Sequence, residues 1–211
     1  MLNIKKYLPL IVLLVAIVAD QALKFYIKLN FTLGESVRVF DWFQILFVEN
    51  PGMAFGWEFG SKMFLTIFRI IVSCAVVWYL IRLVKDEYKL GFQIVITLIL
   101  AGAVGNIIDC IFYGVFFSES TYSTIAEFMP ISGGYATWFV GKVVDMFYFP
   151  LFTFPSWMPV LGGEIFFSPI FNLADSYITV AIFILIIFYH QDFNDTIEKY
   201  ISKKQDILNE K

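Results

Sequence analysis

Four apolar runs, each long enough to cross a lipid bilayer, constrain the fold of this chain more than any other feature. They lie near residues 7–28, 63–84, 90–112 and 169–190, and a helix needs about 20 apolar residues to span the hydrocarbon core. The composition agrees, since 59% of the 211 residues are hydrophobic and 16% are charged, whereas a soluble domain has about 25% charged residues. The sequence therefore predicts a mostly α-helical, polytopic membrane protein with four transmembrane helices in a single domain, 1–211.

The first run has two readings, a retained helix or a signal peptide that is later removed. Lys5 and Lys6 precede an apolar stretch, as they would in a signal peptide. A cleavage site of small residues is missing, however, and the apolar run continues past Asp20. A retained helix is therefore predicted.

The basic residues set the predicted orientation, because cytoplasmic loops carry an excess of Lys and Arg. With the N-terminus inside, the cytoplasmic side holds nine of the 15 basic residues, namely Lys5, Lys6, Arg82, Lys85, Lys89, Lys199, Lys203, Lys204 and Lys211. The connection 113–168 contains only Lys142 and is expected outside. Both termini are then cytoplasmic, and the tail 191–211 has the spacing of an amphipathic helix that lies on a surface.

Two segments between the runs are expected on the outer face. The outer β segment, 30–62, reads as strand between Ser36 and Val48, and Pro51 and Gly52 then predict a tight turn. This segment forms either a hairpin on the membrane or a β-rich cradle whose backbone meets a ligand closely, as glycine allows. The outer loop, 113–168, is rich in aromatic residues, which gather at membrane interfaces. The sequence predicts no fold for 117–138 or 147–168.

Four carboxylates in or beside the apolar runs are the candidate functional residues: Asp20, Asp109, Asp145 and Asp175. An ionised Asp at such a depth costs several kcal/mol unless it is paired or faces a polar cavity. Asp20, Asp109 and Asp175 are predicted to lie within about 10 Å of the outer face. Asn106 and Asn172 each precede an Asp by three residues, so each pair shares a helical face.

These carboxylates favour hydrolysis without a cofactor. Two close carboxylates share a proton, so one can act as a base and the other as an acid toward a peptide carbonyl. The sequence has no HExxH motif, no GxSxG motif and no glycine-rich phosphate loop, so no metal and no cofactor are expected. The formal net charge of −3 argues against nucleic acid as a partner.

Other readings of the same residues stay open at this point. Aligned Asp residues also mark transporters and proton relays, although the inner halves of the third and fourth runs carry no charge. A non-catalytic lipid- or lipoprotein-binding module is a further alternative. Asp175 near a helix start is also explained by simple capping. Asp20 and Lys24, four apart, fit a simple helix ion pair, and Arg69 is expected to extend to the outer headgroups.

Five motifs, in this order along the chain, resemble those of the bacterial lipoprotein signal peptidases (signal peptidase II), a family of membrane aspartyl proteases. They are Asp20-Gln21 with Lys24, Asn50-Pro51-Gly52-Met53-Ala54-Phe55-Gly56, Gly105-Asn106-Ile107-Ile108-Asp109, Val143-Val144-Asp145 and Phe171-Asn172-Leu173-Ala174-Asp175. The chain departs from the family pattern at Cys110, where Arg is usual, and at Met146, where Phe is usual. The loop 113–168 is also longer than is usual in the family.

The resemblance implies an aspartic endopeptidase that removes the signal peptide from diacylglyceryl-modified prolipoproteins by cutting just before the lipidated Cys. It implies that Asp145 and Asp175 form the catalytic dyad. The residues implied in support or substrate binding are Asn50, Gly52, Asn106, Asp109, Asn172, Asp20 and Lys24. The expected partners are the lipidated prolipoprotein and membrane lipids, with no nucleic acid. The protein is expected to be a monomer in the bacterial cytoplasmic (inner) membrane, with its active site at the outer face.

Overall fold

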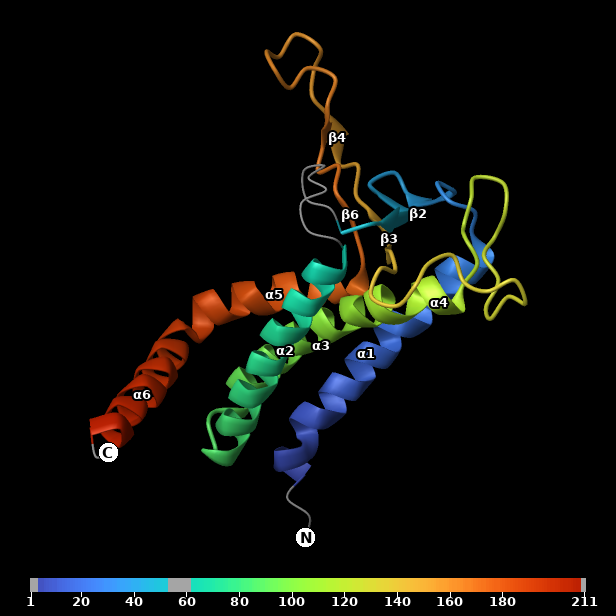
Figure 1. Ribbon diagram of the computed structural model, residues 1–211. Helices are drawn as coiled ribbons and strands as arrows, with labels where there is room; N and C mark the ends of the chain where they lie inside the picture. Colours follow the sequence, from blue (N-terminus) through green and yellow to red (C-terminus); the bar gives the residue numbers. More distant parts are fainter. Residues whose placement is uncertain (1–3, 53–61, 210–211) are drawn as a thin grey trace.

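The computed structural model describes residues 4–52 and 62–209, and most of its elements are helical (Figure 1). The helices are α1 (Ile4–Asn30), α2 (Lys62–Lys85), α3 (Leu90–Ile108), α4 (Gly114–Phe116), α5 (Leu173–Phe188) and α6 (His190–Asn209), with a π-helical turn, η1 (Asp109–Tyr113), between α3 and α4. By length and composition three helices can cross a membrane, or up to four if α5 and α6, bent by 86°, count as one span. The predicted mostly helical, polytopic fold is confirmed.

Two of the predicted spans end or begin elsewhere than expected. The third, 90–112, is α-helical only to Ile108, after which η1 begins. The fourth, 169–190, begins later, at Leu173, because the residues before it form a strand and Asn172 caps the helix. The 16 residues of α5 rise about 24 Å, less than the about 30 Å of a hydrocarbon core. The tail is helical, as predicted, over α6.

The segments outside the long helices form a four-stranded antiparallel sheet in the order β1-β2-β3-β6. Its strands are β1 (Ser36–Phe40), β2 (Phe43–Asn50), β3 (Val143–Tyr148) and β6 (Ile170–Phe171). The predicted strand 36–48 is therefore a hairpin of two strands. Strand β3 comes from the loop 113–168, where the sequence predicted none. The predicted turn continues through 53–56, which lie outside the described residues.

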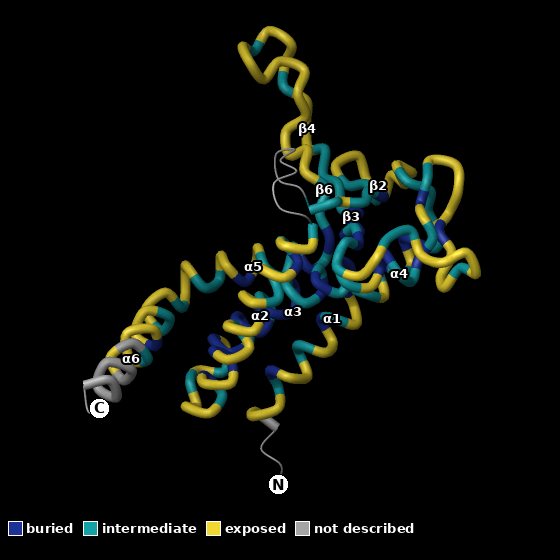
Figure 2. Tube along the Cα trace, in the orientation of Figure 1, coloured by how far each residue is buried: buried dark blue, intermediate teal, exposed yellow. Residues whose placement is uncertain are grey.

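A second, two-stranded sheet pairs β4 (Phe152–Thr153) with β5 (Ile165–Phe166). It belongs to the part of the outer loop for which the sequence predicted no fold. In Figure 1 this hairpin projects away from the helices, and Figure 2 shows it as largely exposed. It does not contribute to the buried residues described below.

Helix α3 is the centre of the bundle and packs against α1, α2 and α5. Glycines allow this close approach. A Cβ atom at Gly102 would overlap the backbone carbonyl of Ala174, and one at Gly105 would press on the carboxylate of Asp20. The small residues of α3 therefore let α1 and α5 come near enough to exchange polar contacts.

An apolar core joins α1 to the sheet. Its buried members are Ile27, Phe47, Tyr113, Phe117, Ala126, Val144 and Met146. The first four residues of β3 are all buried, and β3 lies between β2 and β6. The residue at position 145 is thus held on a strand that is packed on both edges. We call this end of the bundle the sheet end.

Candidate active site

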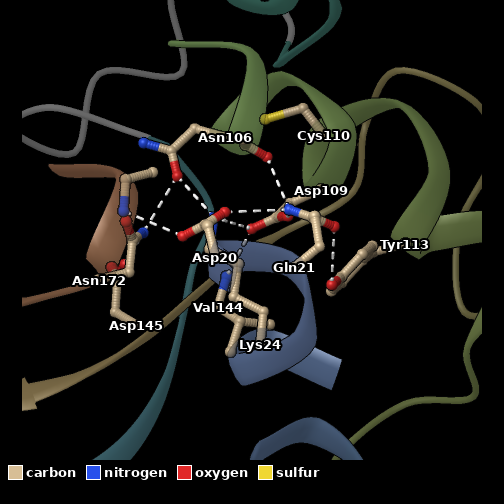
Figure 3. Close-up of polar contacts among 12 residues, drawn as sticks. Asp20, Gln21, Lys24, Asn106, Asp109, Cys110, Tyr113, Val144, Asp145 and Asn172 are labelled. Atoms are coloured by element: carbon tan, nitrogen blue, oxygen red, sulfur yellow. Dashed lines mark hydrogen bonds and ion pairs between the residues drawn. The ribbon is translucent and has the colours of Figure 1, made fainter. Parts of the chain in front are cut away.

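The four predicted carboxylates meet at the sheet end, and Figure 3 shows polar contacts around three of them, Asp20, Asp109 and Asp145. Asp20 lies on α1, Asp109 at the start of η1, Asp145 on β3 and Asp175 in the first turn of α5. The first three are at most 3% exposed, whereas Asp175 is half-buried. These four residues are called the carboxylate cluster below.

Lys24 is the buried cation of the cluster. Its Nζ lies 3.0 Å from Asp20 Oδ2 and 2.8 Å from Asp109 Oδ2, and it donates to Asn106 Oδ1 at 2.9 Å. The expected pair with Asp20 therefore exists, but Lys24 also bridges α1 to α3 and η1. Removing one partner of a buried pair costs about 3–5 kcal/mol, so this contact holds the helices together.

Two further polar residues complete this bridge, and neither was among the predicted site residues. Gln21 Nε2 donates to Asp109 Oδ1 at 3.0 Å and to Asp20 Oδ2 at 3.1 Å, and the Tyr113 hydroxyl donates to Gln21 Oε1 at 3.2 Å. Gln21 stands beside Asp20 in the first motif, so a signal for it exists. Tyr113 reaches the cluster from the π-helical turn, which no periodic pattern in the sequence reveals.

Asn172 connects the two remaining carboxylates. Its Nδ2 donates to Asp145 Oδ1 at 2.7 Å, and its backbone N–H donates to Asp175 Oδ2 at 3.3 Å. In return, the backbone N–H of Asp175 donates to Asn172 Oδ1 at 2.9 Å. Asn172 and Asp175 thus form a capping box at the start of α5, rather than sharing a face inside a helix. Asn106 adds a donor to Asp175 Oδ1 at 2.8 Å.

The surroundings of Asp145 favour its protonated form. Burial, joined by the nearby negative charge of Asp175, raises the pKa of Asp145 to about 7, although hydrogen bonds from Asn50 and Asn172 oppose the shift. Asp175 lies at a helix N-terminus, where a negative charge is favoured. Asp145 can therefore hold a proton near neutral pH beside the carboxylate of Asp175.

Asn50, the last residue of β2, lies close to Asp145 in the pair of strands β2 and β3. Val48 lies opposite Asp145 and Asn50 opposite Val143, so Asn50 is a diagonal neighbour of Asp145 on one face of the sheet. Gly52 has a φ of 73°, a left-handed conformation that favours glycine. Its N–H donates to Asn50 Oδ1 at 2.9 Å. Asn50 therefore both closes the turn and faces the carboxylates.

Cys110, which departs from the family pattern, has a cation beside it from another helix. Arg69 on α2 donates from Nη1 to Cys110 Sγ at 3.4 Å, and its guanidinium lies close to the turn at Gly52. The Arg69 side chain thus contacts Cys110, and its extension to the outer headgroups stays a prediction. A guanidinium group is present at this edge of the cluster although position 110 does not supply it.

A second buried ionic group lies nearby, and sequence reasoning missed it. Glu49 is paired with Lys28 on α1 and, at 3.0 Å, with Lys142 just before β3. Ser120 donates to Glu49 at 3.1 Å. Burial opposes ionisation of Glu49, but the two lysines outweigh it and hold the pKa of Glu49 below its usual value. We call these four residues the buried clamp.

The clamp joins α1, β2, the approach to β3 and the loop after α4. Lys28 and Ser120 are buried, and the Glu49 side chain is 3% exposed. The residues that contact each other here are up to 93 positions apart in the sequence. No motif or periodicity in the sequence relates them, which explains why the clamp was not predicted.

Comparisons with known proteins identify the family of this chain. The model of the family described as Signal peptidase (SPase) II matches residues 12–191. A lipoprotein signal peptidase of Porphyromonas gingivalis is 54% identical over 85% of this chain and 80% of its own, and one of Amoebophilus asiaticus is 34% identical over 89% and 79%.

A solved structure described as a bacterial membrane enzyme, determined by the in meso method at 1.9 Å resolution, aligns with a TM-score of 0.58. It is 26% identical and the alignment covers 85% of this chain and 90% of that one. The range matched by the family model covers most of the chain. This multi-pass membrane protein therefore belongs to the signal peptidase II family, the aspartic endopeptidases that cleave signal peptides from prolipoproteins.

Proposed function

We propose that Asp145 and Asp175 are the catalytic dyad and that the protein cuts a diacylglyceryl-modified prolipoprotein just before its lipidated Cys. The observation that supports this most is the position of Asn172, which hydrogen-bonds to both carboxylates. The raised pKa of Asp145 fits a group that carries a proton near neutral pH. Asp20, Lys24 and Asp109 are proposed to brace the helices, and Asn106 and Asn172 to orient the dyad.

The proposed reaction needs only these two groups and water. The carboxylate of Asp175 takes a proton from a water molecule while the oxygen of that water attacks the scissile carbonyl carbon. Protonated Asp145 gives its proton to the carbonyl oxygen. The C–N bond of the resulting diol then breaks. Asp175 returns its proton to the leaving amine, and Asp145 regains one from a hydroxyl of the diol, so both groups are restored.

The proposed substrate position follows from the site's location at one end of the helices. A lipid-anchored peptide can enter sideways between helices while its acyl chains remain in the bilayer. Asn50 and Gly52, on the turn beside the dyad, are proposed to contact the peptide backbone. We propose that both termini are cytoplasmic, that the protein is a monomer of the inner membrane and that the sheet end faces outward.

Amide substitutions test the dyad. Asp145→Asn and Asp175→Asn are each expected to abolish cleavage of a purified, lipidated prolipoprotein, followed as a mobility shift on a gel, because neither amide can exchange a proton. Asp41→Asn is the matched control, since that carboxylate is 88% exposed on the β1–β2 turn. Thermal melts confirm that each variant is folded. Turnover that persists in either dyad variant would refute the assignment.

A further inference from the structure

A pocket of about 370 Å³ lies at the end of the bundle remote from the sheet, between the start of α1, the end of α2 and the start of α3. In Figure 1 the N-terminal end of α1 and the turn between α2 and α3 lie at this same end. The polar residues that line it are Lys5, Lys6, Lys85, Glu87, Tyr88 and Gln93. Three lysines against one glutamate give the lining a positive charge. We call it the lysine pocket.

The three lysines differ from other lysines at this end. Lys89 pairs with Asp192 at 2.9 Å, and Lys199 pairs with Asp86 at 3.0 Å. In the parts of the chain that the structure describes, no ion pair involves Lys5, Lys6 or Lys85. Their positive charge is therefore not neutralised by those carboxylates, and the pocket attracts an anion.

An apolar groove of about 440 Å³ continues from the lysine pocket along α1 and α2. Its walls include Leu10 and Leu13 of α1 and Val77 and Ile81 of α2. Lys6, Val84 and Lys85 line both spaces, so the polar pocket opens directly into the groove. A ligand that fills both must carry a negative group at one end and a long apolar chain at the other.

We propose that the lysine pocket and the groove bind one anionic phospholipid, with its phosphate among the lysines and an acyl chain between α1 and α2. Basic pockets between transmembrane helices suit anionic headgroups. A free phosphate has no apolar chain that could occupy the groove. A signal peptide does not fit either, because its positively charged n-region would be repelled by the lysines. The site lies at the opposite end of the bundle from the carboxylate cluster.

Native mass spectrometry of the full-length protein in detergent tests the headgroup contact. The probes are dioleoyl phosphatidylglycerol, which is anionic, and dioleoyl phosphatidylcholine, which is zwitterionic. The triple variant Lys5→Gln, Lys6→Gln, Lys85→Gln is expected to weaken phosphatidylglycerol binding at least tenfold, because each lysine near a lipid surface contributes about 1 kcal/mol and 1.4 kcal/mol corresponds to tenfold. Phosphatidylcholine is expected to bind weakly to every variant.

A charge-matched control separates the pocket from general surface charge. The triple variant Arg82→Gln, Lys89→Gln, Lys199→Gln removes three cations at the same end but outside the pocket lining. It is expected to change phosphatidylglycerol binding less than threefold. Equal losses in the two triple variants, or no preference of the wild-type protein for phosphatidylglycerol, would overturn the proposal.

A third variant tests the groove while it leaves the lysines in place. Val77→Trp fills the groove from α2 and is expected to weaken binding of dioleoyl phosphatidylglycerol at least fivefold. Inorganic phosphate at matched ionic strength is expected to leave the bound lipid in place. Undiminished binding to Val77→Trp, or displacement of the lipid by phosphate, would reveal a simple anion site and contradict the lipid assignment.

Discussion

Asp145 is placed where a carboxylate can change its charge near neutral pH. It is 3% exposed, it lies on a strand packed on both edges, and it accepts a hydrogen bond from Asn172. Burial and the charge of Asp175 raise its pKa from 3.8 to about 7. Between about pH 4 and 7 the folded protein therefore holds a proton that the unfolded chain has released, so the free energy of unfolding falls as the pH rises through this window.

Asp145→Asn is expected to remove this pH dependence, because an amide does not titrate. Between pH 5 and 7 the wild-type protein should lose up to about 1.4 kcal/mol per pH unit more than the variant. Thermal melts of the wild-type protein, Asp145→Asn and the exposed control Asp41→Asn at several pH values measure the difference. Parallel curves for the wild-type protein and Asp145→Asn would show that Asp145 ionises freely in the folded state.

Arg69 and position 110 are expected to be interdependent. Cys110→Arg, which introduces the residue usual in the family, would press a second guanidinium against Arg69 in a buried site. Overpacking alone costs about 1–3 kcal/mol, and like charges add to it. The double variant with Arg69→Leu is expected to recover stability. Melting temperatures of both single variants and the double variant give the coupling, and a stable Cys110→Arg protein would contradict the expectation.

The sequence identified the carboxylates and their asparagines because their cost in a membrane makes them conspicuous. It could not assign their geometry. The spacing of three between Asn172 and Asp175 fits both the interior of a helix and a capping box. Strand β6, paired through Ile170 and Phe171, ends just before Asn172 and so places Asn172 at the start of the helix. Tyr113 was missed because its position depends on the π-helical turn, and the contact of Arg69 with Cys110 because nothing local fixes it.

At the scale of elements, the buried clamp ties the paired strands β2 and β3 to α1 and to the loop after α4. Lys28 comes from α1, Glu49 from β2, Lys142 from the residue before β3, and Ser120 from the loop after α4. Glu49 directly precedes Asn50, and Lys142 comes three residues before Asp145. The clamp therefore fixes the two strands that carry these site residues.

Glu49→Gln is expected to cost about 3–5 kcal/mol, because it leaves Lys28 buried without its counter-charge. Thermal melts should show a large fall in the melting temperature. The matched control is Asp41→Asn, which removes an ion pair with Arg38 whose side chains are 66% and 88% exposed, and such pairs contribute about 0–1 kcal/mol. Equal effects of the two variants would show that the clamp is unimportant for stability.

For the elements, hydropathy predicted α1, α2 and most of α3, because a long apolar helix can be identified from its own residues without knowledge of what it packs against. It failed for β3 and β6, whose pairing joins Phe147 to Phe171 across the outer loop. Apolar strand residues next to a helix, as at Ile170, read as part of the apolar run. Long-range partners, rather than local preference, set these boundaries.

At the scale of the whole molecule, α3 is enclosed by α1, α2 and α5, and the sheet lies at one end of this bundle while the lysine pocket lies at the other (Figure 1). The proposed topology puts the sheet end outside and α6 inside. Asp41 on the β1–β2 turn and Ser202 on α6 are both exposed. They therefore report on opposite sides of the membrane.

Cysteine labelling checks this topology. In a background of Cys74→Ala and Cys110→Ala, Asp41→Cys is expected to react with a membrane-impermeant maleimide in intact cells, and Ser202→Cys only in inverted vesicles. Comparable cleavage activity in both variants shows that the labelled proteins are native. Labelling of Ser202→Cys in intact cells would contradict the proposed orientation.

The hydrogen bond from the backbone of Ala174 to Asp20 Oδ1, 2.9 Å long, joins positions that are 154 residues apart. Within α1 alone, Lys24 can already neutralise Asp20, so the first helix is able to enter the bilayer by itself. Asn172 and Asp175 emerge from the ribosome much later. A nascent chain that has not yet made its last span therefore lacks the proposed dyad, which is complete only when the last span docks against the first.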